Sequence, residues 1–196
     1  FLGLVHRLDK PVAGIVLFGK TSKGASRLSE QFRNHTIQKT YHAVVIDKPK
    51  EIKGTIKEKV NKISFFAEGF INKTDEELLA EIKKATKTRT AELSYEVIKS
   101  NGKYSLLKIL PKTGRFHQIR IQMQQMGCPI LGDIKYASAS SRQRRGSPEA
   151  AAQVTQDWAD RKSIALSATA ISFKSATGEK TINLEIPLPE GWKKYI

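Results

Sequence analysis

The chain has 196 residues, with 34 lysines and arginines against 19 aspartates and glutamates, a formal net charge of +15. No apolar run is long enough to cross a membrane, and the single cysteine, Cys128, excludes an intrachain disulfide and a cysteine-rich zinc site. The charge is uneven: residues 101–145 hold nine basic residues and one acid, whereas 68–96 hold seven acids and five bases. Solubility alone is one explanation, but this clustering favours a polyanionic partner such as nucleic acid.

The length and the lack of repeats or linkers indicate one domain over residues 1–196. The chain starts at Phe1 with strand-like residues and no signal-peptide pattern, so we expect a domain truncated at its N-terminus. The four histidines lack metal-ligand spacing and no phosphate-binding glycine motif is present, so we expect no metal and no cofactor. The reducing cytoplasm fits the cysteine usage.

The first half of the chain mixes strands and helices. Residues 1–5 and 14–18 are predicted strands, and Thr21 or Ser22 can cap a helix that runs to about Asn34. The alternation over 37–46 predicts a strand that places Lys39 and Tyr41 on one face. Two further strands are expected within 52–71, and a capping box predicts a helix over 74–85.

In the second half, Asn101-Gly102 predicts a hairpin turn between strands at 91–98 and 104–110. Residues 116–126 are a predicted helix that ends at Gly127, and 137–160 are expected to form a mobile loop. Final strands are predicted at 164–174 and 181–187. Hairpins with a few interspersed helices indicate an α+β fold around a mixed or antiparallel sheet.

The stretch "LVHRLDK" places Arg7 two residues before Asp9, so on a strand their side chains would share a face. Three interpretations are open at this point. The two side chains form a structural ion pair, or Asp9 is an ionised nucleophile or base held by a cation, or Arg7 contacts phosphate and Asp9 orients it.

A second stretch, "TGRFHQIRIQMQQMGCPILGD", covers residues 113–133. His117 and Arg120 are three residues apart, and Arg115 precedes the predicted helix, so cations crowd its first turn. The helix dipole disfavours cations there, which suggests a bound phosphate or carboxylate. In the stretch "KTYHA", Tyr41 is either a half-buried core tyrosine or an aromatic platform for a nucleobase.

Together the segments "HRLDKPVAGIVLFGKT", "KTYHAVV" and "TGRFHQIRIQMQQMGCPILGD", in this order, resemble the RluA family of RNA pseudouridine synthases. A weaker match, "IALSATAISF", has Ser167 where the family usually has histidine. Val12-Ala13-Gly14 stands where TSG is commoner, and Gln122 where histidine often follows. The resemblance implies a long bent sheet with a catalytic cleft across its middle.

It also implies roles for individual residues. Asp9 corresponds to the catalytic aspartate, Tyr41 to the tyrosine that stacks on the target uracil, and Arg120 to the arginine that pairs with the aspartate. Arg7 corresponds to the arginine that fills the gap left by the flipped nucleotide. Since an adjacent guanidinium typically lowers a carboxylate pKa by about 1–3 units, we expect Asp9 to be ionised. Further RNA contacts are expected from the basic side chains of these stretches: Lys39, Lys112, Arg115 and His117.

The resemblance therefore predicts isomerisation of uridines to pseudouridine in structured ribosomal or transfer RNA, by a monomer without membrane contact. One alternative is a non-catalytic RNA-binding module on the same fold. Another is a glycosidic hydrolase, which usually needs two carboxylates. Asp133 is the nearest second acid, and a structural turn role suits it better.

Overall fold

The computed structural model describes residues 1–60, 89–136, 163–178 and 180–196. The predicted helix over 74–85 and the predicted loop over 137–160 lie outside these residues, as does the last part of the strand pair expected over 52–71.

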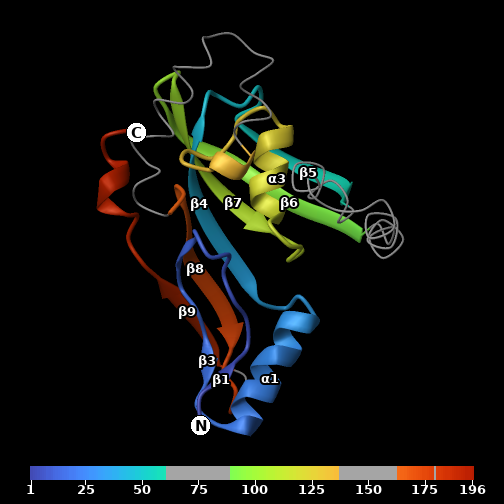
Figure 1. Cartoon of the computed structure of the whole chain (residues 1–196). Helices are drawn as coiled ribbons and strands as arrows, with labels where there is room; N and C mark the ends of the chain where they lie inside the picture. The colour runs from blue at the N-terminus through green and yellow to red at the C-terminus, as the bar shows by residue number, and fades with distance from the viewer. Residues whose placement is uncertain (61–88, 137–162, 179) are drawn as a thin grey trace, which may run out of the picture.

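A large mixed sheet runs through the molecule in the strand order β2-β8-β4-β7-β6-β5 (Figure 1). Its strands are β2 (Ala13–Gly14), β4 (Gln38–Ile46), β5 (Lys53–Val60), β6 (Arg89–Ser100), β7 (Tyr104–Pro111) and β8 (Leu166–Lys174). Strand β9 (Thr181–Glu185) also pairs with β8, and a separate pair joins β1 (Gly3–Leu4) to β3 (Phe18–Gly19). Only β2 and β8 run parallel among the described pairs, which confirms the predicted α+β class.

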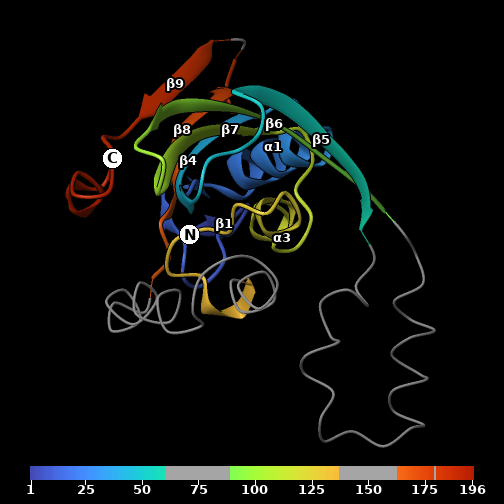
Figure 2. The same cartoon turned by 90° about the horizontal axis from the view of Figure 1, so that it is seen from above.

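Two helices lie on the same, concave side of the curved sheet (Figure 2). Helix α1 (Ser22–Arg33) begins where the Thr21 side chain accepts a hydrogen bond from the Gly24 amide, as the sequence predicted. Helix α3 (Gln118–Gln125) covers the β6–β7 half of the sheet, and a short 3₁₀ helix (Glu190–Trp192) lies near the C-terminus.

Most of the core lies between α3 and the centre of the sheet. Completely buried side chains from β4, β6, β7 and α3 meet there, including Val44, Leu93, Leu107, Ile109 and Met123. The β6–β7 hairpin turns at Asn101-Gly102, with Gly102 at φ 88°, as predicted. This core fixes α3 against the sheet and so sets the position of every side chain at its N-terminal end.

Two sequence predictions need correction. The opening strands are far shorter than expected, and residues 5–12 belong to no strand, so Arg7 and Asp9 do not share a strand face. The imidazole of His6 explains part of this shortening. Its Nε2 accepts a hydrogen bond from the Leu17 amide, so that amide is not available for pairing between strands. Helix α3 begins at Gln118 rather than 116, because His117 adopts a left-handed conformation with φ 51°. Its end before Gly127 agrees with the prediction.

None of the helices in the described residues is both long and apolar enough to span a membrane.

Candidate active site

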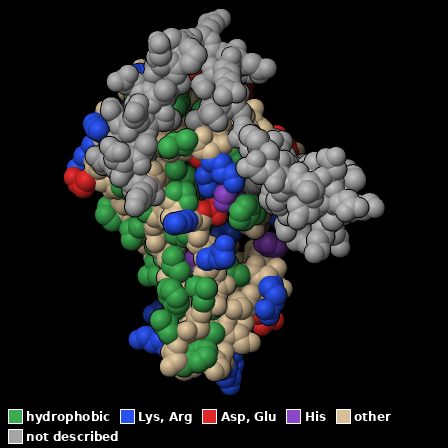
Figure 3. Space-filling model, viewed as in Figure 1, with side chains coloured by type: hydrophobic (Ala, Val, Ile, Leu, Met, Phe, Trp, Pro, Cys, Tyr) green, Lys and Arg blue, Asp and Glu red, His purple; other side chains and the backbone are tan. Residues whose placement is uncertain are grey.

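A cavity of about 480 Å³ opens on the concave face between the loop at residues 6–12, the middle of β4 and the start of α3. The space-filling view shows a hollow at this point, where basic, acidic and histidine side chains gather (Figure 3). Its lining includes all three proposed catalytic residues, Asp9, Tyr41 and Arg120. These come from three segments far apart in the sequence.

The loop that carries Asp9 is fastened at its C-terminal end to β8 and to the residues just before β8. The Val12 amide donates to the Asp9 carbonyl at 2.9 Å and closes a turn. The Pro11 carbonyl accepts from the Ile164 amide, and β2 follows in parallel pairing with β8. Gly14 makes this close approach possible, since it has φ 128° and an added Cβ would collide with the backbone of Ala168.

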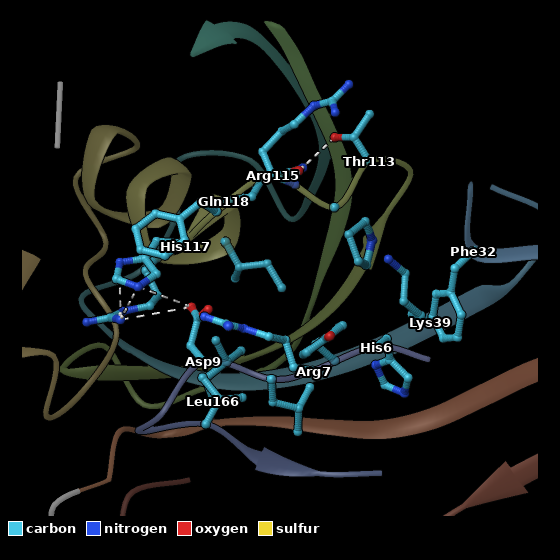
Figure 4. A pocket seen from close by; sticks show the side chains of 18 of the residues that line it. His6, Arg7, Asp9, Phe32, Lys39, Thr113, Arg115, His117, Gln118 and Leu166 are labelled. Carbon is cyan, nitrogen blue, oxygen red and sulfur yellow. Dashed lines mark hydrogen bonds and ion pairs between the residues drawn. The ribbon is translucent and has the colours of Figure 1, made fainter. Parts of the chain in front are cut away.

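The Asp9 carboxylate points into the cavity towards the start of α3 (Figure 4). Its Oδ2 lies 3.9 Å from Nη1 of Arg120 and 3.9 Å from Nε2 of His117. Burial raises the pKa of Asp9, and this outweighs the opposing attraction of Arg120 and Arg7. The expected lowering of this pKa was therefore wrong: desolvation dominates, and Asp133 adds a repulsive negative charge.

Arg120 has its main partner elsewhere. Its Nε and Nη2 each donate to a different oxygen of Asp133 at 2.7 Å, a two-pronged ion pair in which Arg120 is 5% and Asp133 1% exposed. Burial disfavours the charged guanidinium, but the bonds to Asp133 outweigh it and raise the pKa of Arg120. The sequence suggested a bound phosphate or carboxylate at the start of α3, and for Arg120 the anion is a carboxylate of the chain itself, Asp133.

His117 lines the cavity and lies beside both Arg120 and Asp9. Its Nδ1 lies 2.7 Å from the Tyr136 hydroxyl, and both ring nitrogens lie 3.4 Å from Nη1 of Arg120. Burial, with help from the charges of Arg120 and Lys135, lowers the pKa of His117 to about 4. The imidazole is therefore neutral at neutral pH, and it offers a hydrogen-bonding edge, not a cation, to anything near Asp9.

Tyr41 lines the cavity from β4 and is largely buried there. Burial and the nearby Asp9 charge raise the pKa of its phenol to about 12, so the hydroxyl stays protonated. Within the described part of the chain, no group makes a hydrogen bond to this hydroxyl. The ring is thus presented to the cavity as a neutral aromatic surface.

Lys39 lies two residues before Tyr41 on the same face of β4 and lines the opposite end of the cavity (Figure 4). Burial lowers the pKa of its ammonium, and no carboxylate among the described residues lies within ion-pair distance of it. His6 and Phe32 stack beside it with ring centroids 4.4 Å apart. His6 itself is neutral, since burial and the Lys39 charge lower its pKa to about 4.

The remaining predicted RNA contacts fall in different places. Arg7 is exposed and extends along the cavity towards Asp9 (Figure 4), and Arg115 lines the rim while its Nε donates to the Thr90 carbonyl. Lys112 is not part of the cavity lining: its ammonium lies 2.6 Å from Oε1 of Glu92. The structure therefore brings Lys39, Arg7, Arg115 and His117 together and leaves Lys112 outside.

Sequence reasoning missed three residues that hold the site in place. Gln118 accepts from the Arg115 amide and the Thr113 hydroxyl and donates to the Glu92 carbonyl, which shapes the rim. Asp133 and Tyr136 hold Arg120 and His117. The available signal was the close spacing of Asp133 and Tyr136 after the helix, but only the fold shows which side chains they reach.

The sequence profile of the RNA pseudouridylate synthase family matches residues 1–125. The chain belongs to this family. The resemblance to its RluA branch, which rested on the order of three motifs, is thereby confirmed.

Relatives of this RNA pseudouridylate synthase domain include an uncharacterized RNA pseudouridine synthase of Chlorobaculum parvum, 30% identical over 96% of this chain and 55% of that protein. The ribosomal large subunit pseudouridine synthase C of Rickettsia prowazekii is 32% identical over 69% of the chain and 42% of that protein. The tRNA pseudouridine synthase C of Haemophilus ducreyi is 35% identical over 71% and 57%. The chain thus spans roughly half the length of these curated relatives.

The fold also matches a solved structure. Human RNA pseudouridylate synthase domain containing 4 superposes with a TM-score of 0.72 at 23% identity, over 98% of this chain and 73% of that one. At this identity the match supports the fold, and the motifs carry the assignment to the family.

Proposed function

We propose that the intact protein isomerises specific uridines in structured RNA to pseudouridine, with Asp9 as the catalytic residue. The observation that supports this best is the convergence of Asp9, Tyr41 and Arg120 on one cavity with cations around it. Among the described residues, no group of three or more His, Cys, Asp or Glu side chains could hold a metal ion.

The cavity suits a nucleotide that has left its helix. Extruding a base costs roughly a few kcal/mol, and stacking on an aromatic ring returns about 1–3 kcal/mol. Tyr41 offers such a ring beside Asp9, whose carboxylate either attacks C1′ of the ribose or removes its 2′ proton. Both routes break the bond from C1′ to N1 of uracil. The rotated base then joins C1′ through C5, and C5 loses its proton while N1 gains one. On the first route the Asp9 ester bond to C1′ breaks as C5 joins, and on the second Asp9 returns the 2′ proton to the ribose.

The cations along the cavity would hold the RNA backbone. Lys39 carries a half-buried ammonium without a carboxylate partner in the described residues. A phosphate oxygen of the RNA would serve as its anionic partner. Arg7 and Arg115 extend the same positive surface. The named relatives act on ribosomal RNA in one case and transfer RNA in another, and both are candidate substrates for a cytoplasmic enzyme of this kind.

The test is a map of pseudouridine in total RNA from cells that contain or lack the intact protein. We expect particular uridines to lose modification when the protein is absent and to regain it with the wild type. Asp9→Asn should restore none of them. The control is Asp47→Asn, the same chemical change at an exposed aspartate in the turn after β4, which should restore all.

Full restoration by Asp9→Asn would overturn the assignment of Asp9. Loss of the protein without any change in the map, combined with tight binding of the purified protein to structured RNA, would favour the non-catalytic RNA-binding alternative.

A further inference from the structure

Asp133 is the least exposed carboxylate near the cavity, at 1%. Its backbone is fixed, because the neighbouring Leu131 amide donates to Val44 of β4 and the Leu131 carbonyl accepts from Ala165, both at 2.9 Å. The Asp133 amide also donates to the Ile130 carbonyl at 3.1 Å. The carboxylate is therefore held rigidly beside the sheet.

This carboxylate determines where the Arg120 guanidinium lies. Two parallel bonds of 2.7 Å fix both the position and the plane of the guanidinium. Nη1, which also lies 3.4 Å from both ring nitrogens of His117, faces the cavity and stands 3.9 Å from Asp9 Oδ2, beyond hydrogen-bond distance. Arg120 thus faces Asp9 without engaging either of its oxygens in a hydrogen bond.

Building on the function proposed above, we propose that Asp133 is a positioning residue for the reaction. It holds Arg120 back from Asp9 and shares the charge of the guanidinium, so that the Asp9 carboxylate stays available to the ribose of the bound nucleotide. Without Asp133, the guanidinium would be free to take both oxygens of Asp9 in a two-pronged pair of its own.

Several charged or titratable groups face Asp9 from the surrounding elements. They are Arg7 on its own loop, Tyr41 on β4, His117 and Arg120 at α3, and Asp133 and Lys135 after it. Burial raises the pKa of Asp9 most, Arg120, Arg7 and Lys135 lower it, and Asp133 raises it. Loss of the Asp133 charge should therefore lower the pKa of Asp9.

The test uses Asp133→Asn in the intact protein, with Asp47→Asn as the control. NMR titration of isotope-labelled aspartate carboxyls follows Asp9 without any RNA. We expect the Asp9 midpoint to fall in Asp133→Asn and to stay unchanged in the control. With an RNA whose modified uridine has been mapped, the single-turnover rate of Asp133→Asn should fall at least about tenfold while RNA affinity stays within about twofold.

An unchanged Asp9 midpoint and a wild-type rate in folded Asp133→Asn would overturn the proposal. If that variant does not fold, Asp133→Glu decides: it keeps the charge but displaces the guanidinium, so a wild-type rate would refute the positioning role. In the wild type itself, the Arg120 Nε–H signal should persist while Asp9 titrates, and its loss in that pH range would contradict the pairing with Asp133. Because the titration needs no RNA, it can fail or succeed independently of the proposed isomerase activity.

Discussion

The two ends of the cavity differ in how their cations are held. At the α3 end, Arg120 is buried and paired with Asp133 by two short bonds. At the β4 end, Lys39 is half-buried, and no described carboxylate pairs with it. A cation already satisfied by the protein can orient a reacting group, whereas a cation left without a partner can bind a ligand anion. We propose that this difference separates a positioning end of the cavity from a binding end.

The largest expected effect on stability comes from breaking the ion pair between Arg120 and Asp133. Arg120→Ala would leave the Asp133 carboxylate buried and unpaired, which typically costs about 3–5 kcal/mol of stability. Urea unfolding measures this loss directly. Arg115→Ala is the control: its Nε donates a hydrogen bond to the Thr90 carbonyl at the rim, and losing that bond should cost about 1 kcal/mol. Equal losses in the two variants would contradict the contrast between the ends.

Replacing Lys39 should lower RNA affinity and leave the stability of the fold intact. Lys39→Met keeps the apolar stem and removes an ammonium whose charge the fold disfavours, so stability should hold or rise. RNA affinity should fall about tenfold at low salt, and the slope of log affinity against log salt should shrink by about 1.

Lys112→Met is the matched control for this change. Lys112 already pairs with Glu92 outside the cavity, so RNA affinity should change by less than about twofold. A larger loss in Lys112→Met than in Lys39→Met would restore the original sequence prediction for Lys112 and undermine the binding role of Lys39.

The smallest expected effect concerns pH and stability. Because burial raises the pKa of Asp9, ionised Asp9 makes the folded state less stable above the unfolded pKa of that group. Asp9→Asn should therefore unfold at slightly higher urea than the wild type at neutral pH, and the difference should vanish as pH falls through the Asp9 pKa. A less stable Asp9→Asn at neutral pH would show that the carboxylate is favourably paired.

The same raised pKa affects activity. The proposed catalysis uses the ionised carboxylate, so the single-turnover rate should fall with acid at a higher pH than a freely exposed aspartate would give. A pH profile from neutral to acid checks this. A rate that persists down to the pKa of an exposed aspartate would show that burial does not control Asp9.

The sequence predicted which residues line the cavity better than it predicted which side chains pair with one another. The motifs located Asp9, Tyr41 and Arg120, because each lies in a short pattern that can be read locally. The partner of Arg120 lies thirteen residues further along the chain and meets it only through the turn after α3, so Asp133 was assigned to a structural turn. Pairing between side chains depends on packing that a linear pattern does not contain.

The predicted direction of the pKa shift of Asp9 was wrong for a similar reason. A nearby guanidinium can be inferred from a motif, but the burial that outweighs it and the repulsive charge of Asp133 follow only from the fold. The start of α3 was misplaced because residue pattern alone gave no sign of the left-handed backbone at His117. That residue carries an imidazole that lies 3.4 Å from Nη1 of Arg120 and 3.9 Å from Oδ2 of Asp9.

The most direct test of Asp9 is a single-turnover assay of purified intact protein on an RNA that carries the mapped uridine. Wild type and Asp47→Asn should convert the uridine completely. Asp9→Asn should bind the RNA with similar affinity and convert it at least about a thousandfold more slowly. Conversion by Asp9→Asn at a rate close to that of the wild type would contradict the catalytic role of Asp9.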